Sequence, residues 1–388
     1  MSVMKDQRAT SEMNHITILG SIFAHAEKLR VTRSHKLQIF SAVFLCLLFA
    51  QTASAEYLLT TISSVGSNPN GVAYDSAKGE IFVVSQSSNT VSVISDATNT
   101  VVGSPISVGT APISAAYDSA KGEIFVTNNG GDSVSVIDDT TNTVVATISV
   151  GSSPNGLAYD SAKGEIFVTN FGSNNISVID DTTNTVSTTI SVGNGPVGAA
   201  YDSGKGEIFV TNYNDNTVSV IDDTTNTVVG SPISVGSHGR GVAYDSAKGE
   251  IFVTNNGTFT VSVIDDTTNT VVATISVGSS PLGVAYDSGK GEIFVANSGS
   301  NNVSVIDDTT NTVVATISVG SSPLGVAYDS GKGEIFVANF GSNSVSVISD
   351  SAPLSVPEFP LGGMVLMFVV STAAYAVIRY RAMRISHL

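Results

Sequence analysis

The sequence predicts an all-β fold, a seven-bladed β-propeller made of four-stranded antiparallel blades. Three observations lead to this prediction. A Tyr-Asp-Ser triplet recurs every 42 or 43 residues from Tyr74 to Tyr328, and a period near 40 residues is typical of a repeat architecture. Each repeat holds four short apolar runs separated by turn residues, which is the pattern of one propeller blade. The last repeat stops one strand short, and a matching strand precedes the first repeat.

The third repeat shows how one blade is built. Its apolar runs are rich in Val, Ile, Phe, Tyr and Thr, which favour strands. The segment 160–164, Asp-Ser-Ala-Lys-Gly, predicts a tight hairpin in which Gly164 takes a positive φ. The segment 180–184, Asp-Asp-Thr-Thr-Asn, predicts a turn whose side chains bond their own backbone. The strands are expected at 156–159, 165–169, 176–179 and 185–192.

The N-terminal strand at residues 57–65 is expected to complete the seventh blade. That pairing would join the two ends of the repeat region by sheet hydrogen bonds and leave no open edge between the first and last blades. The alternative is an open array of β-modules with ragged ends.

The strand Gly-Glu-Ile-Phe-Val-Thr-Asn, varied as IFVAN and IFVVS, resembles the YVTN β-propeller repeats of archaeal surface-layer proteins, as does the sequence ISVGSSPLGVAYD around it. The likeness recurs seven times and covers most of the chain. It implies a propeller at a cell surface. It implies no particular activity, because that family is defined by its scaffold.

Residues 1–55 are interpreted as an N-terminal extension and signal peptide. Arg33 and Lys36 precede an apolar run at 37–50, and Ala-Ser-Ala follows it, so cleavage is expected after Ala55. An uncleaved N-terminal anchor is the alternative. Cys46, the single cysteine, lies inside the apolar run, so the cleaved protein would have no disulfide and no thiolate metal site.

The C-terminal end is interpreted as an anchor that follows the propeller of residues 56–350. Residues 351–360 form a Ser/Pro linker with a Pro-Glu-Phe-Pro motif, 361–378 an apolar run long enough for a transmembrane or sorting helix, and 379–388 a basic cytoplasmic tail. This order resembles archaeal C-terminal sorting signals recognised by archaeosortase enzymes. An ordinary single-span anchor is the alternative. Both would place the propeller on the extracellular face of the cell membrane.

The net charge of −16 argues against nucleic acid as a partner, because an acidic surface repels phosphate. Most of the 33 acidic residues lie in the two repeated turns, which should open on one face of the ring. Such a face could recruit divalent cations, but Asp is also a good turn residue copied seven times. We therefore assign no metal ligand and no cofactor.

The opposite face carries the variable loops and the candidate binding residues. An inter-blade turn, Ser-His-Gly-Arg, lacks the proline found at this point in the other copies and should lie beside the loop Asn-Tyr-Asn-Asp-Asn. Aromatic side chains beside Asn and Ser suit contacts with envelope proteins or glycans. The alternative is that these loops drifted apart after duplication without gaining a function. Asn-x-Ser/Thr sequons on the same face are candidate glycosylation sites. The binding residues are Phe171, Tyr213, Asp215, His238, Arg240, Phe259 and Phe340, and the sequons begin at Asn175, Asn256 and Asn302.

The sequence favours a binding or structural module of the cell envelope over an enzyme, and we assign no catalytic residue. The innermost strands read GVAYD or SAAYD, which are small and apolar apart from the Asp at the turn. The alternatives are a propeller hydrolase or lyase with its site on the variable-loop face, and a purely structural lattice component. The propeller is expected to be a monomer, held at the membrane by its C-terminal helix.

Overall fold

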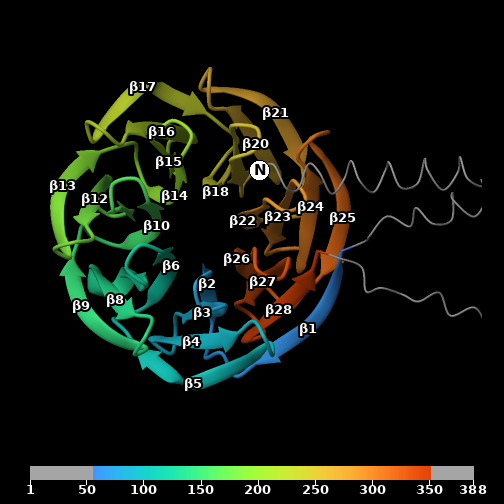
Figure 1. Cartoon of the computed structure of the whole chain (residues 1–388). Helices are drawn as coiled ribbons and strands as arrows, with labels where there is room; N and C mark the ends of the chain where they lie inside the picture. The colour runs from blue at the N-terminus through green and yellow to red at the C-terminus, as the bar shows by residue number, and fades with distance from the viewer. Residues whose placement is uncertain (1–55, 351–388) are drawn as a thin grey trace, which may run out of the picture. The chain divides into compact units, whose positions relative to one another are not determined.

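The computed structural model describes residues 56–350, which form a ring of seven four-stranded antiparallel sheets (Figure 1). The predicted seven-bladed propeller is confirmed. The expected signal peptide, linker, C-terminal helix and basic tail lie outside the described residues. Within residues 56–350 the structure contains no helix that could span a membrane.

Each blade runs from an innermost strand at the central axis to an outermost strand at the rim. Blade one is β2 (Pro69–Asp75), β3 (Glu80–Ser85), β4 (Thr90–Ser95) and β5 (Thr100–Ser107); blade two is β6 (Pro112–Asp118), β7 (Glu123–Asn128), β8 (Ser133–Asp138) and β9 (Thr143–Ser149). Blade three is β10 (Pro154–Asp160), β11 (Glu165–Asn170), β12 (Asn175–Asp180) and β13 (Thr185–Ser191); blade four is β14 (Pro196–Asp202), β15 (Glu207–Asn212), β16 (Thr217–Asp222) and β17 (Thr227–Ser234). Blade five is β18 (Gly239–Asp245), β19 (Glu250–Asn255), β20 (Thr260–Asp265) and β21 (Thr270–Ser276); blade six is β22 (Pro281–Asp287), β23 (Glu292–Asn297), β24 (Asn302–Asp307) and β25 (Thr312–Ser318). Blade seven is β26 (Pro323–Asp329), β27 (Glu334–Asn339), β28 (Ser344–Ser349) and β1 (Tyr57–Ser63), and a single 3-10 turn, η1 (Asn129–Gly131), follows β7.

The strands of blade three begin and end within two residues of the predicted positions. Both predicted turns are confirmed. Gly164 has a φ of 68° in the hairpin. The backbone N–H of Thr183 donates to Asp180 Oδ1 over 2.8 Å in the second turn. Hydrogen bonds from Thr183 hold the pKa of Asp180 below its usual range, because they stabilise the charged carboxylate.

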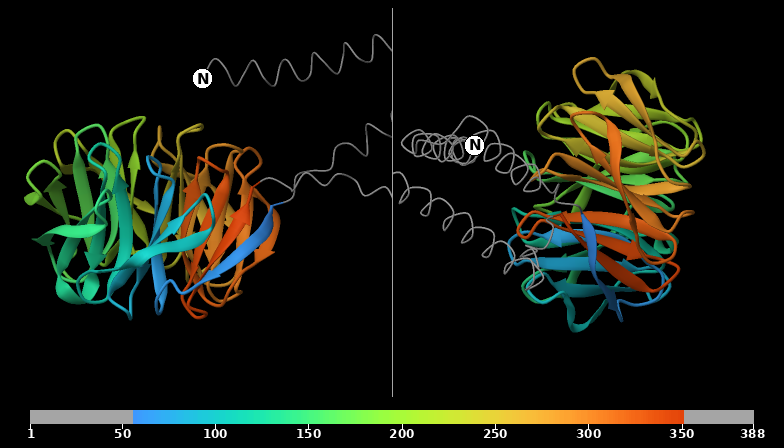
Figure 2. Two further views of the ribbon diagram at one scale, coloured as in Figure 1. Left: turned by 60° about the horizontal axis from the view of Figure 1, so that its bottom comes forward. Right: turned by 90° about the vertical axis from the view of Figure 1, so that its right-hand side faces the viewer.

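The N-terminal strand closes the ring as predicted. β1 pairs antiparallel with β28, with Ser63 opposite Ser344, and Figure 2 shows the two strands side by side. Ile62 packs in a cluster that joins blade seven to blade one. Val65 is fully buried, and its carbonyl accepts hydrogen bonds from the hydroxyl groups of Ser85 and Ser92 in blade one. The first strand is therefore part of the seam between the last blade and the first.

The core lies between the blades rather than inside each one. Phe82 and Val93 of blade one pack against Ile124 and Val126 of blade two, and the same packing recurs around the ring. Because each sheet is covered on both faces, its two middle strands are buried along almost their whole length, including polar residues such as Thr169 and Ser177. One phenylalanine per blade is completely buried: Phe82, Phe125, Phe167, Phe209, Phe252, Phe294 and Phe336.

A ring of ion pairs joins neighbouring blades on the acidic face. Lys78 in the hairpin of blade one lies 2.9 Å from Asp139 in the outer turn of blade two, and it also donates to the Asp139 carbonyl. All the remaining blades make the same link to the next blade. In blade six, however, Lys290 pairs with Glu56 instead of an aspartate. The remaining links are Lys121–Asp181, Lys163–Asp223, Lys205–Asp266, Lys248–Asp308 and Lys332–Asp96.

The acidic repeats therefore have a structural role that the sequence did not reveal. The second aspartate of the outer turn is buried, as shown by Asp139 and Asp181 with 6% exposure each. A buried carboxylate needs a partner, and the lysine of the preceding blade supplies one. Within the described residues no group of three or more His, Cys, Asp or Glu side chains is arranged to hold a metal ion.

Candidate functional site

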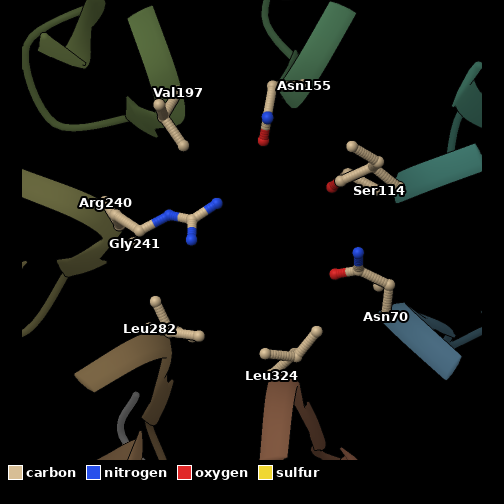
Figure 3. Close-up of a pocket in the computed structure, with 12 residues that line it drawn as sticks. Asn70, Ser114, Asn155, Val197, Arg240, Gly241, Leu282 and Leu324 are labelled. Carbon is tan, nitrogen blue, oxygen red and sulfur yellow. The ribbon is translucent and has the colours of Figure 1, made fainter. Parts of the chain in front are cut away.

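The variable-loop face opens on a cavity of about 180 Å³ at the end of the central channel (Figure 3). The second and third residues of the innermost strands line it. The third residue is glycine in six of the seven blades, because adjacent innermost strands approach closely here. A Cβ on Gly156 would lie 2.4 Å from the carbonyl oxygen of Val197 in the next blade. The backbone thus forms a tight collar. The side chains of six second residues point into the channel in Figure 3, as does that of Ser114, the third residue of β6; the six are Asn70, Asn155, Val197, Arg240, Leu282 and Leu324.

The polar side chains of the collar lie in blades one to three, where the apolar side chain of Ile113 also lines the cavity. Asn70, Ser114 and Asn155 lie together on one side, and Arg240 faces them from the other (Figure 3). Apolar side chains stand on both sides of Arg240: Val197, Leu282 and Leu324.

Arg240 is the only lysine or arginine in residues 56–350 that makes no ion pair. The seven lysines of this range are all held by carboxylates of a neighbouring blade. Burial lowers the pKa of Arg240 from its ordinary value, but a guanidinium stays protonated at neutral pH. The cavity therefore contains a permanent and partly desolvated positive charge with no counter-charge among the described residues.

Tyr213 and His238 form an aromatic pair beside Arg240. Their rings stack with centroids 4.5 Å apart. The guanidinium carbon of Arg240 lies 5.9 Å from the centroid of the Tyr213 ring, which is within the range of a cation–π interaction. Phe171 meets the Tyr213 ring edge to face at 6.4 Å. The structure thus brings four of the predicted binding residues into one cluster.

The repeat itself explains why these aromatic rings meet. The loop between the second and third strands of each blade lies against the inter-blade turn that precedes the blade, as in the bond from the Tyr213 N–H to the Gly195 carbonyl, 2.9 Å. In blades three and four a buried asparagine, Asn170 or Asn212, ends the second strand. The side chain of the next residue reaches the inter-blade turn that follows the blade. The Phe171 ring lies over Gly195, and the Tyr213 ring lies over His238 at the equivalent position one blade later.

The other three predicted binding residues lie apart from this cluster. Asp215 Oδ2 accepts a hydrogen bond of 2.6 Å from the backbone of Asn194, which is the role that Ser173 has in the preceding blade. Phe340 is half-buried in the loop of blade seven, where its carbonyl accepts a hydrogen bond from Asn68. Phe259 is 46% exposed in the loop of blade five.

Phe259 also occupies a position that has a structural function in other blades. There an asparagine side chain accepts a hydrogen bond from the next inter-blade turn, as Asn216 does from the His238 N–H over 2.8 Å. Phenylalanine cannot accept this bond. Blade five therefore lacks this hydrogen bond from the loop to the following turn, and an exposed aromatic ring stands in the place of the asparagine.

Two of the three sequon asparagines already have hydrogen bonds in the structure. Asn175 and Asn302 begin strands, and their Oδ1 atoms accept bonds from the buried side chains of Asn170 and Asn297, at 2.9 and 2.8 Å. Asn256 lies in the loop of blade five, and its backbone N–H donates to the His238 carbonyl over 3.0 Å. Of the three, Asn256 is therefore the one next to the aromatic cluster.

Sequence analysis did not identify Asn70, Ser114 and Asn155 as site residues. A signal was present, because the second residue of the innermost strand reads Asn, Ile, Asn, Val, Arg, Leu and Leu in the seven copies, and the third is glycine in every copy except for Ser114. From the sequence alone, these residues are assigned to the inter-blade turns. Only the closed ring shows that they point at one another across the channel.

Comparison with known proteins identifies the fold but not the function. No family model and no curated protein matches the chain. The fold matches 1642 chains of solved structures, so it does not distinguish one function from another. One of them, Kuenenia stuttgartiensis Hydrazine Synthase, has a TM-score of 0.68 and 22% sequence identity, and the match covers 74% of this chain and 96% of that one. This likeness shows the fold alone, and the resemblance to YVTN repeats stays a prediction.

Proposed function

We propose that the protein is a non-catalytic binding module of the cell envelope that captures its partner on the variable-loop face. The observation that carries this proposal is the cluster of Phe171, Tyr213, His238 and Arg240, which lies next to the channel cavity. Aromatic residues and arginine are enriched in binding surfaces and contribute much of the binding energy there. A propeller scaffold holds these loops in fixed positions, so that little ordering is needed on binding.

A binding role fits the cavity better than a catalytic one. Its lining contains asparagine, serine, arginine and apolar side chains but no carboxylate. The one acidic side chain in the neighbouring loop of blade four, Asp215, is engaged by the backbone of Asn194. A general acid or base must reach the reacting atom, and none of the residues that line the cavity is suited to that work.

The location at the cell surface is also a proposal. It rests on the leader-like segment that ends at Ala55 and on the apolar run at 361–378, which is followed by Arg379, Arg381 and Arg384. The partner would then be an envelope protein or glycan, and the propeller would stand outside the membrane. A purely structural lattice component would share this location but would not need the cluster.

The proposal is tested by capturing envelope components on the immobilised protein. The variant F171S/Y213S/F259S/F340S should lose capture while its circular dichroism and melting temperature stay close to those of the wild type. The matched control is V145S/V272S/V314S, which removes three apolar side chains at the outer rim that are 53–54% exposed. Equal capture by the quadruple variant and the wild type would overturn the proposal, as would loss of capture only in the rim variant.

A further inference from the structure

The second residues of the innermost strands differ from the rest of the repeat because their side chains change in type from blade to blade, from Asn70, whose Nδ2 donates to Gln86 Oε1 over 3.4 Å, to Arg240, which makes no ion pair. Arg240 is placed where a neutral residue would fold equally well, since the equivalent positions hold Asn70, Asn155, Val197 and Leu282 in other blades. Burial of an unpaired guanidinium is unfavourable, and the contact with the Tyr213 ring offsets only part of that cost. A site that holds a charge in this way is prepared for a ligand of opposite charge.

We propose that the channel cavity binds a sugar acid, with the ligand carboxylate on Arg240 and its hydroxyl groups on Asn70, Ser114 and Asn155. This inference rests on the proposed function, because it assigns a ligand class to the same face. A guanidinium presents parallel N–H donors that match the two oxygens of a carboxylate. Asparagine and serine side chains both donate and accept, as sugar hydroxyl groups require.

The charge of the site favours a monoanion over a phosphate. Arg240 contributes one positive charge, and residues 56–350 otherwise contain far more acidic than basic side chains. A carboxylate would neutralise Arg240, whereas a doubly charged phosphate would leave a negative charge in an acidic protein.

The size and polarity of the cavity favour one sugar ring. A volume of about 180 Å³ lies below the range of pockets that enclose a drug-sized ligand. Val197 and Leu282 flank Arg240, and the polar side chains of Asn70, Ser114 and Asn155 lie across the channel, on the side that also holds Ile113 (Figure 3). A hexuronate matches the charged and polar side chains of this lining, with a carboxylate at one end for Arg240 and hydroxyl groups on the rest of the ring for the polar side chains across the channel.

Isothermal titration calorimetry of the full-length protein with sodium D-glucuronate tests the proposal. We expect saturable binding with a Kd below about 5 mM, and weaker binding of acetate, which lacks hydroxyl groups, of glucose, which lacks the carboxylate, and of inorganic phosphate. No saturable binding of glucuronate would overturn the proposal. Tighter binding of phosphate than of glucuronate would also overturn it.

Two variants that copy residues from other blades identify the contacts. Arg240→Leu, which copies Leu282, should weaken glucuronate binding at least tenfold. Asn155→Val, which copies Val197, should reduce the ratio of the acetate Kd to the glucuronate Kd. Val145→Ser is the control and should bind as the wild type does. Unchanged binding in Arg240→Leu would overturn the proposal.

A further ligand distinguishes the source of the sugar acid. Methyl β-D-glucuronide should bind as well as glucuronate if the site takes the terminal residue of a glycan, and binding of the free acid alone would support a soluble sugar acid. Failure of glucuronate binding with intact, cluster-dependent capture of envelope components would overturn this inference and leave the proposed function standing. Glucuronate binding without such capture would overturn the proposed function instead.

Discussion

The two faces of the ring consist of copies of the same repeat, but they differ in what their charged side chains contact. On the acidic face each lysine crosses to a carboxylate of the next blade, as Lys205 does to Asp266. On the variable-loop face Arg240 points into the channel and makes no ion pair, and its guanidinium lies near the Tyr213 ring. Charges that join blades are therefore part of the fold. The unpaired charge is the feature that needs a function.

The seam between blade seven and blade one gives the largest expected effect on the fold. A protein that begins at residue 66 lacks β1 and exposes the edge of β28, together with the apolar surface that Ile62 covers. We expect a loss on the order of 5 kcal/mol in the free energy of unfolding, and aggregation through the free edge. Thermal unfolding and light scattering measure both.

The matched control for this truncation is a protein that begins at residue 56. It keeps β1 and should behave as a stable monomer. Equal melting temperatures and equal particle sizes for the two truncated proteins would show that closure of the ring does not depend on β1.

Breaking one inter-blade ion pair should have a smaller effect. Lys205→Met leaves the carboxylate of Asp266, whose side chain is 10% exposed, without its cation. We expect a loss of about 1–2 kcal/mol, because the pair is only partly shielded from water. The double variant K205M/D266N should recover part of the loss, since no buried charge is left unpaired. A Lys205→Met protein that unfolds at the wild-type denaturant concentration would contradict this role of the ring of ion pairs.

The junction of blades six and seven should make stability depend on pH. Burial, and after it the nearby carboxylate of Glu56, raises the pKa of Glu292 to about 7. A carboxyl group with a raised pKa in the folded state stabilises the fold below its unfolded pKa of about 4.5. That contribution is lost as the pH rises from there to about 7. The melting temperature should therefore fall over this range.

The matched variant for the pH series is Glu292→Gln, which stays neutral and should show a shallower fall. The difference is expected to be modest, because Glu292 is only half-buried and solvent screens its charge. Identical slopes for the two proteins would show that Glu292 does not cause the pH dependence.

The smallest expected effect comes from a hydrogen bond that three blades lack. Thr254 Oγ1 donates to the carbonyl of Leu282 in the next blade over 2.7 Å, and Ala296 holds the equivalent position in blade six. The facing strands have the same sequence, PLGVAYD, in both cases. Ala296→Thr should therefore raise the free energy of unfolding by about 0.5–1 kcal/mol, and Thr254→Ala should lower it by a similar or larger amount. Denaturant titration measures both, and a destabilised Ala296→Thr protein would contradict the expected bond.

The sequence predicted the fold well because its information is periodic. Seven copies of a strand and turn pattern identify the blade, and the missing strand at the end of the last copy identifies the closure through β1. The turn conformations followed from local chemistry at Gly164 and Asp180. These features depend on neighbours in the chain or on the repeat length, and both can be read directly.

Contacts between blades could not be predicted in the same way. Lys78 and Asp139 lie 61 residues apart in the sequence and meet only when the ring forms. The sequence predicted that the loop of Tyr213 lies beside the turn of His238, but it did not predict that the two rings stack. The convergence of Asn70, Asn155 and Arg240 needs the whole ring, because these residues come from three different blades.

The stability of Arg240→Leu tests the difference between the two faces most directly. If Arg240 is an unpaired charge held for a ligand, its replacement by the residue of blades six and seven should leave the melting temperature of the unliganded protein unchanged or higher. Lys205→Met, measured beside it, should melt at a lower temperature than the wild type. A loss of stability in Arg240→Leu as large as that in Lys205→Met would contradict the account and make Arg240 a structural residue.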